Sequence, residues 1–222
     1  NDVGAIKGEY LVSPFGGAHN LLYDGFTPGI QVYNFGSSDQ TDVMVKASID
    51  GPGGNVYGEN IGPLAMLSGD TVSIFPGNTD EFIAWQLGVG NYTDGDYTLT
   101  YTVSMAGLTD DSNFDNVYTS DFKIQSNQIS LSRLDGGDMP IGSSFPSNST
   151  TEYQSCIVFQ DANASALGVV GMYFIPHTDT SINELAGAEI FANAYQWDDA
   201  WVDLDDVNYQ FDPATNDAFQ NL

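Results

Sequence analysis

The chain has 222 residues and a formal net charge of −26, because 30 Asp and Glu residues stand against four Lys and Arg residues. Hydrophobic residues make up 41% of the chain and aromatic residues 13%, which supplies a core and excludes a disordered chain. The basic residues are scattered and form no patch, which excludes nucleic acid and an anionic membrane surface as partners. They are Lys7, Lys46, Lys123 and Arg133.

The acidic residues are mostly aspartates, which are typical of turns and of short-range cation ligands. Such a composition fits exported proteins of saline habitats and also cell-surface modules that bind calcium, and it does not separate the two. We therefore predict an extracellular or cell-surface protein. No stretch approaches the ~20 apolar residues that a membrane-spanning helix needs, so no membrane insertion is predicted. Cys156 is the single cysteine and is expected to be a buried thiol.

The first half of the chain alternates apolar with polar residues. Segments 29–35 and 42–49 show this period of two, and each ends at a turn rich in Gly, Asp or Ser. The segment 97–105 puts Tyr97, Leu99, Tyr101 and Val103 on one face, where we expect the core. The spacing predicts about eight strands of a β-sandwich. The other predicted strands are 55–61, 71–75, 81–87 and 117–124.

A polar break at residues 125–128 separates the two halves, and a long polar loop at 135–151 follows it. A short helical turn is expected at 179–186. The fold class we predict is all-β, with two β-sandwich domains. Residues 1–125 form an immunoglobulin-like sandwich, and residues 126–222 form a second sandwich that is jelly-roll-like or irregular. The strands expected in the second half are 129–134, 152–160, 166–175, 188–197 and 200–211.

Side-chain oxygens recur at every second residue in the segment 110–116, at Asp111, Asn113 and Asp115. Oxygen ligands spaced in this way begin many calcium loops, so calcium is the candidate cofactor. Counted from Asp111, the sixth and twelfth positions hold Asn116 and Phe122, where an EF-hand needs Gly and an acid. The sequence therefore leaves two alternatives: a calcium site of another kind, or a solvated turn between two strands.

A second acidic group lies near the end of the chain. Asp203 and Asp205 share one face of a predicted strand, and like charges held so close raise each other's pKa unless a cation lies between them. This pattern predicts a second calcium site. The alternative is the charged solvent face of an edge strand, where such residues discourage aggregation.

Two indoles, Trp197 and Trp201, flank the acidic turn at 198–199. Sugar rings stack their C–H faces on such side chains while carboxylates bind the hydroxyls, which makes this pair a candidate carbohydrate site. The alternative is a cross-strand pair that stiffens a hairpin.

Catalysis finds no support in the motifs. His19 and His177 are the only histidines and lack a zinc-binding spacing, and no nucleophile elbow or phosphate loop occurs. Some close carboxylate pair is inevitable among 30 acids, so a glycosidase cannot be argued from their number. We predict that the chain is not an enzyme.

Several segments carry a family resemblance. Residues 2–6, 29–36, 95–101 and the pattern Asp111-x-Asn113 resemble CARDB-type and related immunoglobulin-like domains of secreted Bacteroidota proteins. The second half, from 132 to the Trp197 hairpin, is similar to the β-rich segment that follows such domains in type IX-exported surface proteins. The resemblance implies a modular extracellular role in adhesion or scaffolding and brings no catalytic residues.

These observations predict a non-enzymatic, extracellular surface, adhesion or fibre-forming protein that calcium stabilises. Its partners would be further copies of the chain, joined as an oligomer or filament by strand addition at sheet edges. The alternative function is a carbohydrate-binding module that holds a glycan with Trp197 and Trp201. A carboxylate-pair glycosidase is the third hypothesis.

Overall fold

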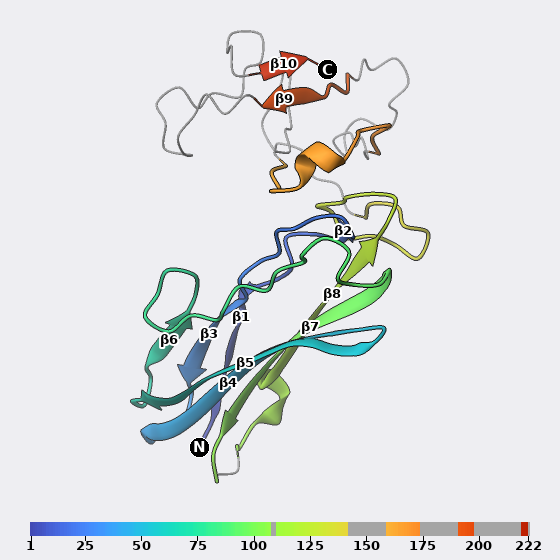
Figure 1. Ribbon diagram of the computed structural model, residues 1–222. Helices are drawn as coiled ribbons and strands as arrows, with labels where there is room; N and C mark the ends of the chain where they lie inside the picture. Colours follow the sequence, from blue (N-terminus) through green and yellow to red (C-terminus); the bar gives the residue numbers. More distant parts are fainter. Residues whose placement is uncertain (108–109, 142–158, 174–190, 198–218, 222) are drawn as a thin grey trace, which may run out of the picture. The chain divides into compact units, whose positions relative to one another are not determined.

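The computed structural model describes residues 1–107, 110–141, 159–173, 191–197 and 219–221 (Figure 1). The chain forms two compact units, Asn1–Gly142 with Gln160–Gly168, and Ser143–Phe159 with Val169–Leu222. Regular structure in the described residues is β, apart from the 3-10 turns η1 (Asn113–Asp115) and η2 (Ala164–Ala166). This confirms the predicted all-β class. Of the helical segments described, none is long and apolar enough to cross a membrane.

The smaller sheet of the first unit has three antiparallel strands in the order β1-β3-β6. They are β1 (Val3–Leu11), β3 (Gly29–Asn34) and β6 (Thr71–Ile74). The sequence predicted β3 and β6 at nearly these positions. β1 was not predicted as a strand from the sequence. The pairing register of β1 shifts between Ala5 and Tyr10, and this irregularity interrupts the alternation of buried and exposed residues that marks a strand.

The larger sheet has five strands in the order β2-β8-β7-β4-β5. All neighbours are antiparallel except β2 and β8, which run parallel. Figure 1 shows the two sheets as the layers of the first unit. The strands are β2 (Gly17–His19), β4 (Gln40–Gly51), β5 (Gly54–Met66), β7 (Gly95–Met105) and β8 (Val117–Gln125).

The core lies between the two sheets and follows the predicted alternation. Tyr97, Leu99, Tyr101 and Val103 of β7 are each at most 2% exposed, which confirms them as core residues. Neighbouring strands bury every second residue in the same way. Their buried members include Val43, Val45, Ala47 and Ile49 of β4, Phe122 and Ile124 of β8, and Val3, Ile30, Val32 and Ile74 of the smaller sheet.

Tyr101 ties the two sheets together with its hydroxyl group. It donates a hydrogen bond to the carbonyl of Leu11 at 2.5 Å and accepts one from the N–H of Gly29 at 2.9 Å. Both partners belong to the smaller sheet, so one buried side chain of β7 satisfies two backbone groups across the core. Burial raises the pKa of Tyr101, which keeps the hydroxyl protonated as this donor.

Residues 81–87, predicted to form a strand, form none. Trp85 makes a single isolated bridge to Phe26, and the rest of the segment is loop. The buried side chains are Phe82, Trp85 and Leu87, whereas Ile83 is 67% exposed, so burial does not alternate. These apolar residues anchor a loop onto the core. The strand was predicted from their hydrophobicity, which does not distinguish a buried loop from a strand.

The segment 129–134 was likewise predicted as a strand and is a loop with isolated bridges at Ser130 and Leu134. A side chain, and not a continuous row of strand-to-strand hydrogen bonds, holds this loop against the rest of the unit. The guanidinium of Arg133 donates to the carbonyls of Ser13, at 2.6 Å, and of Phe15. The described part of the predicted strand 166–175 also lacks regular structure after η2.

Buried Asp161 attaches the segment Gln160–Gly168 to the first unit. Its carboxylate accepts hydrogen bonds from the backbone N–H groups of Tyr23, at 3.1 Å, and of Asp24, at 2.9 Å. The N–H of Ala162 donates in return to the carboxylate of Asp24 at 3.0 Å. Two acids therefore fasten this segment through backbone donors.

The second unit is described only in part. Its strands β9 (Tyr195–Trp197) and β10 (Phe219–Asn221) pair antiparallel, and β9 coincides with the end of the predicted strand 188–197. The strand predicted at 200–211, the helical turn at 179–186 and Cys156 lie outside the described residues, as does nearly all of the strand predicted at 152–160. Contact units are not the same as independently folding domains, so the limits 1–125 and 126–222 stay predictions.

Replacing Tyr101 with Phe should lower the free energy of unfolding by about 1–3 kcal/mol, because two buried backbone groups lose their partner. Tyr101→Ala should cost more, about 3–5 kcal/mol, since it also opens a cavity. Urea unfolding followed by tryptophan fluorescence, to which buried Trp85 contributes, measures both. The matched control is Tyr23→Phe, because Tyr23 is 48% exposed and should tolerate the change. Equal effects of the two Phe variants would contradict the bridging role of Tyr101.

Candidate cation site

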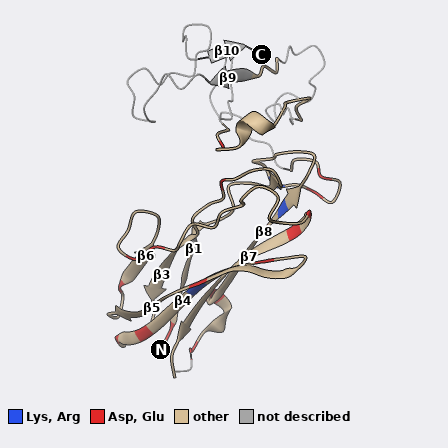
Figure 2. Ribbon diagram, viewed as in Figure 1, with Lys and Arg blue, Asp and Glu red and all other residues tan. Residues whose placement is uncertain are grey.

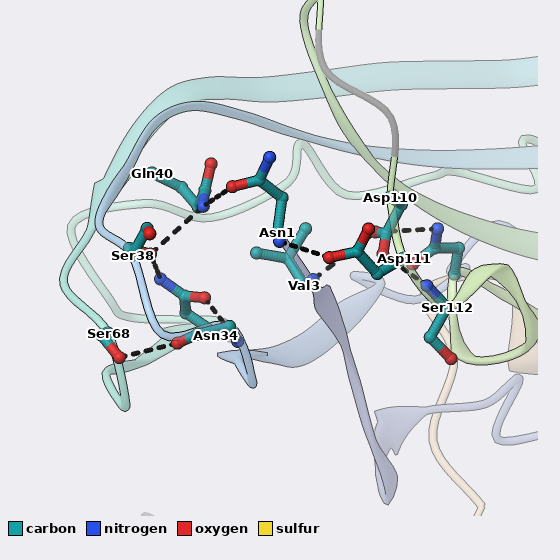
Figure 3. A network of polar contacts seen from close by, with 11 residues as sticks. Asn1, Val3, Asn34, Ser38, Gln40, Ser68, Asp110, Asp111 and Ser112 are labelled. Carbon is teal, nitrogen blue, oxygen red and sulfur yellow. Dashed lines mark hydrogen bonds and ion pairs between the residues drawn. The ribbon is translucent and has the colours of Figure 1, made fainter.

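Acidic residues from two distant parts of the sequence meet where β1 begins and where the loop between β7 and β8 returns. The carboxylate of Asp110 lies 3.5 Å from the N–H of Val3, and η1 contacts β1. The side chain of Asp110 also accepts from the N–H of Ser112 at 3.0 Å and from the amide of Asn116 at 3.1 Å (Figure 3). Asp110 therefore organises the loop through its own neighbours.

Asp111 has a different partner. Its carboxylate accepts a hydrogen bond of 2.6 Å from the ammonium group of Asn1, and Figure 3 shows the two groups facing each other. This hydrogen bond is the main cause that raises the pKa of the ammonium group. The side chain of Asp111 is 73% exposed, so solvent screens the pair and it adds little to stability.

Three acceptor oxygens in this region are buried and have no hydrogen-bond partner among the described residues. They are Oδ1 of Asp2, Oδ1 of Asp115 and Oδ1 of Asn116. Burial raises the pKa of Asp2, and the negative charge of Asp115 raises it further. Burial also raises the pKa of Asp115, with a smaller contribution from the charge of Asp110. A proton on the carboxylates, a hydrogen-bond donor or a cation would offset the desolvation of these oxygens.

Gly4 makes this arrangement sterically feasible. A Cβ atom at residue 4 would lie 2.4 Å from Oδ2 of Asp115, so only glycine lets the carboxylate lie against β1. The neighbouring Tyr118 donates its hydroxyl to the carbonyl of Ala5 at 3.1 Å and not to Asp115. The carboxylate thus rests on the backbone of β1 without gaining a donor from it.

The structure separates the three residues that the sequence grouped as a calcium loop. Asp111 is paired with the ammonium group, and Oδ1 of Asn113 accepts from the amide of Asn116 at 3.4 Å. Of the three, only Asp115 has a buried oxygen without a hydrogen-bond partner among the described residues. The 3-10 turn η1 explains this, because at three residues per turn positions two apart do not face the same way. Within the described residues, no three His, Cys, Asp or Glu side chains are arranged to hold a metal ion.

Sequence reasoning missed Asp2 and Asn116 as candidate ligands. Asn116 comes directly after the loop residues Asp111, Asn113 and Asp115. Its role as a candidate ligand could be recognised only once the geometry of the turn is known. Asp2 lies more than a hundred residues earlier in the chain, and only the tertiary structure brings it to the loop. No local signal in the sequence marks it.

The remaining candidate residues are not placed as sites. Asp203, Asp205 and Trp201 lie outside the described residues, and so does the side chain of Trp197. The backbone of Trp197 pairs with Phe219 at the end of β9. The second calcium site and the sugar-binding Trp pair therefore stay predictions. His19 makes a local contact, in which its Nδ1 accepts from the N–H of Leu21 at 3.1 Å.

Comparison with known proteins gives structural neighbours and no sequence relatives. Neither the protein-family models nor the curated proteins contain a match to this chain. Among solved structures, the crystal structure of the CARDB domain of the PF1109 protein from Pyrococcus furiosus, in complex with di-metal ions, is 13% identical, with a TM-score of 0.36. The match covers 56% of this chain and 93% of that domain.

Two further solved structures are similar to the chain. The solution structure of the same CARDB domain is 12% identical over 57% of this chain and 93% of its own, with a TM-score of 0.33. The C-terminal domain of wzt is 17% identical over 55% of this chain and 69% of its own, with a TM-score of 0.27. CARDB domains are among the solved structures to which this chain is similar. The Bacteroidota and type IX context stays a prediction.

The unpartnered carboxylates predict an unusual dependence of stability on pH when divalent cations are removed by a chelator. Because the pKa values of Asp2 and Asp115 are raised in the folded chain, folding takes up protons, and their contribution to stability grows as the pH falls through the folded pKa. Asp115→Asn should therefore be more stable than the native chain at pH 7 in chelator. This advantage should shrink as the pH falls through the raised folded pKa and be gone below about pH 4, where carboxyl groups are protonated in the unfolded chain too.

Urea unfolding at a series of pH values measures this difference. Asp80→Asn is the matched control, because it removes one charge from an exposed residue in the loop after β6. An equal gain in both variants would mean that general charge repulsion, and not the burial of Asp115, is relieved.

Proposed function

We propose that the chain is a non-enzymatic, extracellular β-sandwich module of a surface, adhesion or fibre-forming protein, and that a bound calcium ion stabilises its first unit. The observation that carries the cation is the group of three buried acceptor oxygens on Asp2, Asp115 and Asn116 that have no donor among the described residues. A calcium ion prefers oxygen ligands of this mixed carboxylate and amide kind.

A cation is a better complement to this group than protonation. At neutral pH a proton on Asp2 or Asp115 would satisfy one oxygen at a time, whereas a single cation contacts several oxygens at once. The net charge of −26 also raises the concentration of cations around the protein. Backbone carbonyls and water would complete the coordination, since calcium takes about six to eight oxygens.

The proposed extracellular role rests on where the charge lies. Figure 2 shows Asp and Glu on strands and loops of the first unit, with few Lys and Arg among them. The whole chain has only four basic residues, so most acids have no basic partner in it. A surface of this kind is kept soluble by its charge and is compatible with a cation-rich medium outside the cell.

Strand addition at a sheet edge is the proposed route to assembly into an oligomer or filament. β5 is an edge strand of the larger sheet and is the longest strand described, with 13 residues. Pro63 has no N–H and so limits pairing near its end, and Glu59 puts a charge on it. The stretch 54–61 precedes Pro63 and has Glu59 as its one charged residue, and it is the part of the edge that we propose for a strand from another copy.

The alternative function is carbohydrate binding, in which Trp197 and Trp201 would hold a glycan. Its support is the sequence pattern of two indoles around an acidic turn. Loss of polysaccharide binding on Trp197→Ala would favour it, and unchanged binding would remove it.

Calcium should raise the free energy of unfolding relative to chelator at constant ionic strength, by about 2.7 kcal/mol when free calcium is 100 times its dissociation constant. Asp115→Asn should abolish this gain. Asp111→Asn is the matched control and should keep it, because Asp111 already binds the ammonium group of Asn1. Thermal unfolding of the full chain measures all three proteins.

Two outcomes would contradict the proposed ligands. If Asp111→Asn also abolished the gain, the calcium loop predicted from the sequence would be the correct one. If molar NaCl stabilised the native chain as much as calcium does, the effect would be screening of charge and not a site.

Assembly has its own test in electron microscopy and light scattering of the full chain over a range of concentrations. Growth of regular filaments or discrete oligomers is the expected result. A chain that stays monomeric at all concentrations, with and without calcium, would contradict assembly through β5 and would leave the calcium proposal standing.

A further inference from the structure

Two described asparagines are followed two positions later by Thr or Ser, with no proline between. They are Asn91, in the segment 91–93, and Asn163, in the segment 163–165; a third, Asn148, lies outside the described residues. This three-residue pattern is the acceptor sequence for N-linked glycosylation, which takes place on surface loops of secreted proteins. Because so short a pattern also arises by chance, the surroundings of each asparagine decide whether it can accept a glycan.

Asn91 lies in the loop between β6 and β7, and the backbone before it is held in place. The N–H of Gly88 donates to the carbonyl of Tyr23 at 3.0 Å, and the N–H of Gly90 donates to that of Asn20 at 2.7 Å. The N–H of Asn91 donates to the carbonyl of Gly88 at 3.1 Å and closes a turn. A Cβ atom at residue 88 would lie 2.4 Å from Nδ2 of Asn91, so glycine leaves the space beside this amide free.

The middle residue of the acceptor sequence, Tyr92, anchors it to the core. Its hydroxyl accepts a hydrogen bond from the indole N–H of buried Trp85 at 2.9 Å, and the two ring centroids are 5.2 Å apart. The carbonyl of Thr93 accepts from the hydroxyl of Tyr97 at 2.8 Å. Asn91 and Thr93, on either side of Tyr92, are both exposed. The anchored tyrosine thus leaves the two residues that define the acceptor sequence open to solvent.

Asn163 has different surroundings. It is half-buried, and its side-chain amide donates to the carbonyl of Leu21 at 2.7 Å. Its backbone N–H donates to the carboxylate of Asp161 at 2.7 Å, and its carbonyl accepts from the N–H of Ala166 at 3.0 Å. A glycan on this nitrogen would disturb the hydrogen bond to Leu21 and the attachment of the segment Gln160–Gly168. Of the two described sequences, only that of Asn91 is therefore free to react in the folded chain.

We propose that Asn91 is an N-glycosylation site and that Asn163 stays unmodified in the folded chain. This inference rests on the proposed extracellular role, because N-linked glycans are added to proteins that are exported. The donor would be a lipid-phosphate-linked oligosaccharide, and the enzyme an oligosaccharyltransferase. The site uses none of the oxygens proposed for calcium.

The reaction forms one bond and breaks one. Nδ2 of Asn91 attacks the anomeric carbon of the donor and forms a C–N bond. The bond between that carbon and the phosphate oxygen breaks, and its electron pair leaves with the lipid phosphate. The amide nitrogen gives up one proton to a basic group of the enzyme, so the products are a neutral N-glycosyl amide and the free lipid phosphate.

The test incubates the folded full chain with a lipid-phosphate-linked oligosaccharide and an oligosaccharyltransferase that requires only Asn-x-Ser/Thr. The chain has only four Lys and Arg, so an Asp-specific protease is used, and it releases the fragments 80–93 and 161–177 for mass spectrometry. Fragment 80–93 should carry the glycan and fragment 161–177 should not. Asn91→Gln and Thr93→Ala should both lose the modification, whereas Thr93→Ser should keep it, because serine retains the hydroxyl.

Synthetic peptides of residues 86–96 and 158–168 are the matched controls, and both should be glycosylated because neither has the fold around it. Absence of glycan at Asn91 of the folded chain would overturn the proposal, and the first peptide then shows whether the sequence or its presentation is at fault. Equal transfer to Asn91 and Asn163 of the folded chain would contradict the selection by structure.

Peptide mapping of the native protein separates this inference from the proposed function. Native protein outside the cell with unmodified Asn91 would overturn the glycosylation site and leave the extracellular role standing. Native protein found inside the cell would contradict the extracellular role itself. Neither result bears on the response to calcium.

Discussion

The antiparallel pairing of β4 with β7 is the constraint on which the rest of the first unit depends. Its register runs without interruption from Val43 opposite Met105 to Asp50 opposite Thr98. Because side chains alternate, this register sends Val45, Ala47 and Ile49 to the same face as the aromatic residues of β7. A shift of one residue would turn that face to solvent, so the core fixes the register and the register fixes where the flanking turns lie.

With the faces so assigned, the acids of the first unit lie outside the hydrophobic core, and three kinds of surroundings accommodate them. Backbone N–H groups satisfy Asp161 and Asp135. An ammonium group satisfies Asp138 and Asp111. Asp2 and Asp115 have an oxygen that neither kind of partner reaches among the described residues. This contrast supports the calcium proposal, because the first two groups of acids have backbone or ammonium donors as hydrogen-bond partners, whereas these two oxygens have none among the described residues.

The fold was predictable where the alternation of apolar and polar residues in the sequence matches the alternation of burial. In β4 and β7 this alternation identifies the core residues directly. Prediction failed where an apolar side chain anchors a loop, as Trp85 does, because hydrophobicity reports burial and not backbone pairing. It failed again at the candidate site. Asn113 and Asp115 both lie in the 3-10 turn η1, where side chains two residues apart do not face the same way, so their spacing of two does not bring them together. The contribution of Asp2 depends on a contact across the fold that no local pattern encodes.

The hairpin of β7 and β8 carries acids at both of its ends, and the two ends differ in one respect. Gly95 pairs with Ile124 at the end that holds Lys123, and Thr102 pairs with Val117 at the end next to Asp115. At the first end the chain contributes its own cation, because the ammonium group of Lys123 pairs with Asp138 and lies 4.0 Å from the carboxylate of Asp96. At the other end no described Lys or Arg pairs with Asp2 or Asp115. A buried carboxylate must be protonated or neutralised, and the cation that we propose for that end would come from solution.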